Sequence, residues 1–246
     1  RIASRIIDRI EEQKNKRKSS RFSFFRVHET VPVFGRRGAG KSTFLLTAID
    51  LWAQGSAPFY DSKYRDIEPL QPIDPTMLGM HEHILLTILQ RIVARVEYLR
   101  EQQPFADSRP YDSEYEEWWD ALRKLAKGLQ AIGEGDDTAN ARTFAWDDEE
   151  FYLDRHLDMA QQGKDLEEQF HDFVEKSAEL LNKKGFVLPL DDVDVKPSIG
   201  WHVLEVIRKY LTTPRLIVLL SGDSRLYSLL IRQEQMKCFA LARGRA

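Results

Sequence analysis

Apolar residues recur along the chain with two spacings, and their alternation predicts the fold class. Short apolar runs, typical of buried strands, occur at four places. They lie at residues 29–34, 66–77, 186–194 and 214–223. In residues 66–77 we expect a short strand followed by a turn that its prolines punctuate. Elsewhere apolar residues recur every three or four positions, which predicts helices. These helices are expected at residues 1–18, 41–55, 81–102, 165–185, 198–213 and 224–242. Strands that alternate with helices predict an α/β fold with a mostly parallel sheet.

Residues 101–165 differ from the rest in composition, and we interpret them as a mainly helical insertion. The segment is rich in acidic residues, Gln and Gly, with a helix expected at residues 113–132 and a turn-rich stretch at 133–150. The chain then divides into four parts. These are an N-terminal helix (residues 1–20), the first half of a core domain (21–100), the insertion (101–165) and the second half of the core (166–246). Because the chain starts at Arg1 and ends soon after a helical pattern, we expect a truncated fragment of a larger protein.

Composition and charge exclude several functional classes. The chain has 246 residues, of which 42% are hydrophobic, and a net charge of −3, so bulk charge does not indicate a nucleic-acid partner. The single cysteine excludes an internal disulfide framework and fits a reducing compartment. No apolar run approaches the about 20 residues that span a bilayer, and no signal-peptide pattern is present. We therefore expect a cytoplasmic protein without a membrane span.

A glycine-rich loop between the first predicted strand and the helix after it carries the strongest chemical signal. Residues 35–42, GRRGAGKS, match the phosphate-loop pattern G-x-x-x-x-G-K-[ST] at every fixed position. Glycines let the backbone approach phosphates, and successive N–H groups form an anion-binding concavity. Lys41 is expected to reach the β- and γ-phosphates, and the Ser42 hydroxyl to ligate Mg²⁺. The predicted nucleotide-binding residues are Gly35, Arg36, Arg37, Gly38, Ala39, Gly40, Lys41, Ser42 and Thr43. For the two arginines, a solvated loop tip is the alternative.

Acidic residues follow the apolar run at residues 186–190. We assign Asp191 to Mg²⁺ and Asp192 to the polarisation of an attacking water. Asp194 fits a turn as well as a catalytic role. Aspartate is one methylene shorter than the glutamate often found at the second position, so we expect hydrolysis to be slow.

The strand expected near residues 216–220 also ends in polar side chains. In phosphate-loop proteins with an extra strand between the loop strand and the acidic strand, this strand is the inserted one. We expect Ser221 or Asp223 to sense the γ-phosphate, and a helix N-cap is the alternative for this segment. No [NT]-K-x-D guanine signal follows the strand, which favours ATP over GTP.

Three stretches together, GRRGAGKST, LPLDDVD and LIVLLSGD, resemble the KAP group of P-loop NTPases within the AAA+/STAND class. The resemblance implies a three-layer α/β fold of the ASCE/AAA+ type, with a parallel central sheet and a long insertion. It also implies a Mg²⁺-dependent ATPase that drives or gates a ring-like homo-oligomer. The chain departs from the group at Val195, where an arginine is usual, and its insertion has no membrane helices. An arginine finger, a lid and a last core strand are expected beyond Ala246.

Soluble members with an insertion look like the ATPase components of prokaryotic antiphage systems, in particular the RADAR type that works with an adenosine deaminase. This resemblance implies a deaminase or another effector protein as partner. The alternative is a scaffold whose oligomerisation depends on nucleotide and whose turnover is negligible. A small-molecule kinase is disfavoured by the paired acids Asp191 and Asp192.

Two further clusters have plain structural explanations. His81 and His83 lie at a helix start, where a polar cluster accounts for them better than a metal site does. Tyr115, Trp118 and Trp119 lie in an acidic surrounding, so packing within the insertion accounts for them better than base stacking does.

Overall fold

The computed structural model describes residue 26 and residues 28–54, 66–78, 83–102, 113–137 and 149–243. The helix expected at residues 1–18 lies outside this part. The described strands are β1 (Thr30–Phe34), β2 (Ile67–Pro69), β3 (Gly185–Leu190) and β4 (Leu216–Gly222). The described helices are α2 (Lys41–Gln54), α3 (Ile84–Glu101), α4 (Ser113–Asp137), α5 (Glu149–Leu180), α6 (Pro197–Lys209) and α7 (Ser224–Arg243), with a 3-10 turn, η2, at Pro75–Met77.

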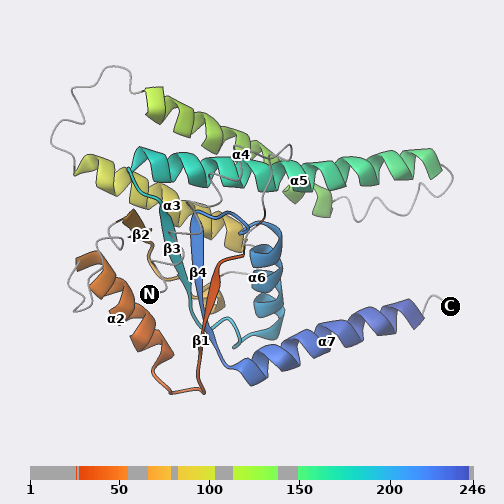
Figure 1. Ribbon diagram of the computed structural model, residues 1–246. Coiled ribbons are helices and arrows are strands. Elements are labelled where there is room, and N and C mark those ends of the chain that lie inside the picture. The colour runs from red at the N-terminus through yellow and green to blue at the C-terminus, as the bar shows by residue number, and fades with distance from the viewer. Residues whose placement is uncertain are drawn as a thin grey trace.

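The four strands form one parallel sheet in the order β1-β4-β3-β2 (Figure 1). This arrangement confirms the mixed α/β class and the parallel sheet. It also confirms that the strand at residues 216–222 is inserted between the loop strand and the acidic strand. The continuous apolar run of β3 is buried along its whole length, as expected of an inner strand covered on both faces.

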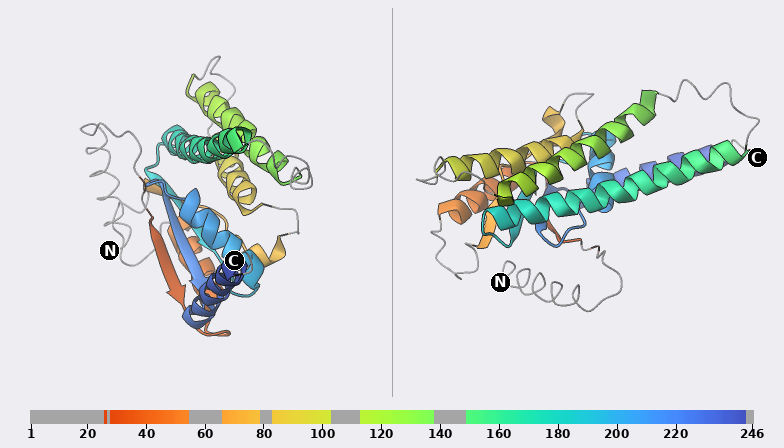
Figure 2. Two further views of the ribbon diagram at one scale, coloured as in Figure 1. Left: turned by 90° about the vertical axis from the view of Figure 1, so that its right-hand side faces the viewer. Right: turned by 90° about the horizontal axis from the view of Figure 1, so that it is seen from above.

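Helices cover both faces of this sheet (Figures 1 and 2). Successive side chains along a strand point to opposite faces, so each strand contributes apolar side chains to both helical layers. On one face, Val187 and Ile217 contact Ile49 and Trp52 of α2. On the other face, the neighbouring residues of β3 and β4 join a larger core that includes buried side chains of α3, α5 and α6. The carboxyl ends of all four strands meet at one edge of this three-layer body, where ligand sites of α/β proteins lie.

β1 is the outer strand of the described sheet, and its hydrogen bonds show which groups face outward. The Glu29 carbonyl accepts from Val218 N at 2.9 Å, and Gly35 N donates to the Gly222 carbonyl at 3.1 Å. Because main-chain groups alternate along a strand, Thr30, Pro32 and Phe34 direct theirs away from β4. Pro32 has no N–H, so this outer edge lacks a donor at its centre.

Two helices, α4 and α5, differ from their expected ends. α4 continues through Gly133 and Gly135 to Asp137, and α5 begins at Glu149 rather than near Asp165. The expected turn-rich stretch is thus helical at both of its ends. Glycine costs a helix only about 1 kcal/mol per residue, and neither helix contains a proline. α5 therefore continues across the expected boundary at residue 165, while the division into domains stays a prediction.

The aromatic cluster of α4 has the packing role that its acidic surroundings favoured. Trp118 is fully buried, stacks on Tyr115 and contacts Phe173 of α5. Its indole N–H donates to the Ser177 hydroxyl at 2.8 Å. The cluster thus joins α4 to α5 rather than only packing within the insertion.

Two further expectations concern helix starts and membranes. His83 caps α3, with Nδ1 accepting from Leu85 N at 3.2 Å, while His81 lies outside the described residues. In the part of the chain that the structure describes, no helix is both long and apolar enough to cross a bilayer.

Candidate functional site

The loop between β1 and α2 has the backbone geometry that its glycines predict. Gly38 and Gly40 have φ values of 79° and 82°, which side-chain-bearing residues rarely adopt. The Lys41 ammonium group donates to the carbonyls of Gly35, at 3.0 Å, and Arg36, at 3.4 Å, so its side chain folds back along the loop. The glycines and the lysine therefore form one compact turn at the carboxyl end of β1.

The start of α2 adds an anion-attracting helix end to this turn. Phe44 N donates to the Gly40 carbonyl at 2.8 Å, which opens the helix directly after the glycines. Ser42 and Thr43 are exposed in its first turn, where free N–H groups and the helix dipole favour a negative group. Arg36 and Arg37 are also exposed, which fits both a role near the phosphates and a solvated loop tip.

The second part of the site lies at the tips of β3 and β4. The Asp191 carboxylate accepts hydrogen bonds from the Ser221 hydroxyl and, at 3.0 Å, from Asp192 N. Asp192 N also lies 3.2 Å from Ser221 Oγ. Asp192 itself has a φ of 49°, a left-handed conformation that Asp and Asn adopt more readily than other residues with a side chain.

Electrostatics connect the acidic edge to the loop. Burial raises the pKa of the Asp192 carboxyl, and the charges of Asp191 and Asp74 raise it further. The Lys41 ammonium acts in the opposite direction and lowers that pKa, so Lys41 is close enough to Asp192 for their charges to interact. The loop and the paired aspartates, about 150 residues apart in sequence, therefore belong to one site.

Asp74, the N-cap of η2, lies close enough to Asp192 to raise the pKa of that carboxyl, and the sequence pattern did not single it out. After β2 the chain rejoins the sheet at Ile73, whose N–H donates to the Pro189 carbonyl and whose carbonyl accepts from Asp191 N, both at 2.9 Å. Asp74 is thereby held beside the β3 tip, and its carboxylate accepts from Thr76 N at 2.8 Å. An acidic residue directly after an apolar strand end was the available signal, but the adjacent Pro75 indicated only a turn.

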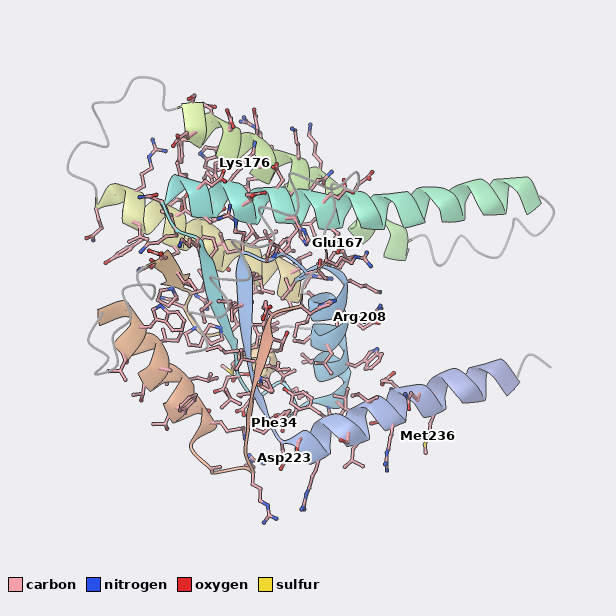
Figure 3. All side chains as sticks on the ribbon, viewed as in Figure 1. Phe34, Glu167, Lys176, Arg208, Asp223 and Met236 are labelled. Atoms are coloured by element: carbon pink, nitrogen blue, oxygen red, sulfur yellow. The ribbon has the colours of Figure 1, made fainter. Side chains whose placement is uncertain are left out.

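The structure separates the two polar candidates at the end of β4. The Asp223 carboxylate accepts from Arg225 N at 2.9 Å, so it caps α7, whose first turn is shown in Figure 3 beside the Asp223 label. Ser221 is the one whose side chain contacts Asp191. Capping thus accounts for the Asp223 carboxylate, and Ser221 is the candidate that contacts the acidic edge, while γ-phosphate sensing by either residue stays a prediction.

Asp194 lies in the turn that the sequence predicts, yet it is 7% exposed. One carboxylate oxygen accepts from Asp223 N at 2.8 Å, while Oδ1 is buried and has no hydrogen-bond partner among the described residues. Burying a carboxylate costs free energy unless the carboxylate is paired or hydrogen-bonded. Here it joins the loop after β3 to the tip of β4.

The donor set of the site suits a small hard cation shared with phosphate. Asp191 and the exposed Ser42 hydroxyl offer oxygen ligands, which Mg²⁺ prefers. Among the described residues, no group of three or more His, Cys, Asp or Glu side chains can hold a metal ion on its own. Mg²⁺ needs no such cage, since it usually binds one or two carboxylates together with phosphates and water.

Comparison with known proteins adds no identification. No protein-family model matches the chain, and no curated protein matches it. The resemblance to KAP-type NTPases therefore depends on the three motifs and on the site that they form.

Proposed function

We propose that the chain is the nucleotide-binding core of a Mg²⁺-dependent ATPase of the P-loop class. The observation that carries this proposal is the strand order, which brings the glycine loop after β1 and the paired aspartates after β3 to the same edge of one parallel sheet. A phosphate loop alone supports binding only. Paired carboxylates within electrostatic reach of the loop lysine add the groups that hydrolysis needs.

Each residue has a distinct task in this reaction. The loop N–H groups, Lys41 and the start of α2 bind the phosphates and oppose the charge that develops during transfer. Mg²⁺, when bound by Asp191 and Ser42, neutralises phosphate charge. Asp192 takes a proton from the water that attacks the γ-phosphorus. Its raised pKa makes it a stronger base once ionised. Ser221 keeps the Asp191 carboxylate in place.

The strand order and motifs also support a more specific assignment. The order β1-β4-β3-β2 places one strand between the loop strand and the acidic strand, as in the ASCE/AAA+ type. We assign the chain to KAP-type ATPases of the AAA+/STAND class. On this proposal it is a cytoplasmic ATPase that drives or gates a homo-oligomeric ring, in antiphage defence with an adenosine deaminase as effector.

One observation favours a second function, a nucleotide-held scaffold with negligible turnover. The second acid of the pair is the short Asp192, and its main chain is held at a φ of 49°. A carboxylate with a short, constrained reach is a poor base for a water that must also line up with the γ-phosphate.

Two variants distinguish these functions. Asp192→Asn keeps the polar shape, so the ATPase proposal predicts phosphate release that falls by at least about 100-fold while ATP binding persists. Lys41→Ala should abolish ATP binding, whereas Lys209→Ala, on the surface of α6, should change neither activity nor binding. Steady-state phosphate release and calorimetric binding, on the assembled protein, provide the readouts. Binding without turnover in the unmodified protein would favour the scaffold, and tight ATP binding by Lys41→Ala would refute both.

A further inference from the structure

Tyr227 of α7 lies behind the acidic edge and touches both strands that frame the site. The residue is 7% exposed, and its hydroxyl donates to the Ser221 carbonyl at 2.7 Å. Its ring contacts Phe34, the last residue of β1, with ring centroids 6.2 Å apart. A single side chain therefore contacts the strand before the phosphate loop and the residue that holds Asp191.

The ring also determines which residue can follow Ser221. A Cβ added to Gly222 would lie 2.3 Å from Tyr227 Cε2, which no real contact tolerates. Glycine at this position lets the tyrosine ring lie directly against the β4 main chain. The ring is thus held by its neighbours, and its hydroxyl is aimed at one acceptor.

The same segment is fixed on its other side by Asp194, whose carboxylate accepts from Asp223 N. The Ser221 main chain consequently lies between two hydrogen bonds, one from Tyr227 and one at Asp223. Burial, together with the negative charges of Asp194, Asp191 and Asp192, raises the pKa of the Tyr227 phenol. The hydroxyl therefore stays protonated and remains a donor at physiological pH.

We propose that Tyr227 is a positioning residue of the ATPase site, which holds the Ser221 main chain so that the Ser221 hydroxyl fixes the Asp191 carboxylate. The inference rests on the proposed function. Tyr227 contacts neither the nucleotide loop nor the acids through its hydroxyl, so its effect on them passes through Ser221. The orientation of the metal ligand Asp191 then depends on the first turn of α7, which lies outside the sheet.

The test is a double-mutant cycle between Tyr227→Phe and Ser221→Ala. Tyr227→Phe keeps the ring against Gly222 and removes only the hydroxyl. We expect it to lower kcat about fivefold, the effect of one ordinary hydrogen bond, with KM and the Mg²⁺-free affinity for ATP unchanged. Ser221→Ala should lower kcat at least as much, and Tyr227→Phe should add nothing in the Ser221→Ala background. Tyr210→Phe, at the far end of α6, is the matched control and should leave kcat unchanged.

Three results would overturn the inference. One is an unchanged kcat in Tyr227→Phe with only a lower free energy of unfolding, since that marks a merely structural tyrosine. Another is full additivity of the effects of the two substitutions on kcat, since that means that Tyr227 does not act through Ser221. The third applies if the unmodified protein binds ATP without hydrolysing it, an outcome that refutes the ATPase proposal by itself. The positioning role of Tyr227 is then tested by the increase in ATP affinity that Mg²⁺ causes. An unreduced Mg²⁺ gain in Tyr227→Phe would then refute the positioning role.

Discussion

The hydroxyl of Ser221 donates a hydrogen bond to the carboxylate of Asp191, 30 residues earlier in the chain. The bond exists because β4 lies directly beside β3 in the sheet, with Leu190 opposite Leu220. It gives the acidic edge a fixed arrangement in which Asp191 faces Ser221 while Asp192 is turned by its positive φ. Four predictions test this arrangement and the body that supports it.

Replacing Asp192 by Asn should stabilise the fold at neutral pH. The carboxyl has a raised pKa in the folded protein, so the folded state binds its proton more tightly than the unfolded state does. The free energy of unfolding therefore falls as pH rises from the ordinary value of 3.8 through the raised value, and the loss is complete above it. Asn does not ionise and tolerates a positive φ, so the variant avoids this loss.

Urea unfolding of both proteins across this pH range measures the effect. The advantage of Asp192→Asn over the unmodified protein should shrink as pH falls towards 3.8. An advantage that stays constant with pH would mean that the backbone conformation, rather than the charge, is responsible.

Replacing Asp74 by Asn should shift the pH profile of ATP hydrolysis to lower pH. The Asp74 charge raises the pKa of Asp192, so its removal lowers the pH at which Asp192 becomes an ionised base. Asn retains an oxygen to accept from Thr76 N. The midpoint of the rising limb of kcat is the quantity to measure, with exposed Asp50→Asn on α2 as the control. Equal midpoints in all three proteins would show that the Asp74 charge does not influence the catalytic base.

Gly222→Ala should destabilise the protein by about 1–3 kcal/mol through overpacking. The added methyl meets the Tyr227 ring, so the penalty should shrink in a Tyr227→Ala background. Gly38→Ala provides the contrast, because nothing lies within 4 Å of its Cβ position and its cost comes from a φ of +79°. Denaturant titration of the four variants distinguishes steric from conformational cost, and an undiminished Gly222 penalty without the ring would contradict the proposed contact.

Trp118→Ala should cost about 3–5 kcal/mol of unfolding free energy, because it empties a fully buried site and removes the indole N–H that donates to the Ser177 hydroxyl. The partly exposed Trp119, next to it on α4, should cost less when replaced by Ala. ATP affinity of the folded fraction should not change in either variant. Equal losses from the two tryptophans would indicate that α4 packs through a different face.

Local patterns were sufficient for the elements and for the loop. Short apolar runs and helical periodicity predicted the four strands and the described core helices. The glycines of the loop predicted positive φ values, which Gly38 and Gly40 adopt and Gly35 does not. These features depend on nearby residues, so a single sequence contains them. The ends of α4 and α5 were wrong because acidic and glycine-rich composition was read as turn, although no proline ends either helix.

The sequence alone did not indicate the roles of Asp74 and Tyr227, because these roles depend on how the elements are arranged in space. Asp74 matters only because β2 lies beside β3, and Tyr227 only because the first turn of α7 packs against the end of β4. Asp223 posed the opposite problem, because a helix cap and a sensing residue share one local pattern. Only the hydrogen bonds of its carboxylate and of Ser221 separate them.

The missing N–H of Pro32 has a consequence for how the molecule behaves in a crowded solution. Among the described strands none pairs with the outer side of β1, and an edge without a partner is a template on which another strand can extend the sheet into aggregates. Any strand laid against the outer side of β1 loses the central bond of its ladder at Pro32, so each such encounter is weakened where it would otherwise be strongest. The residue that shortens this ladder lies three positions before the phosphate loop, and it protects the strand that carries the loop.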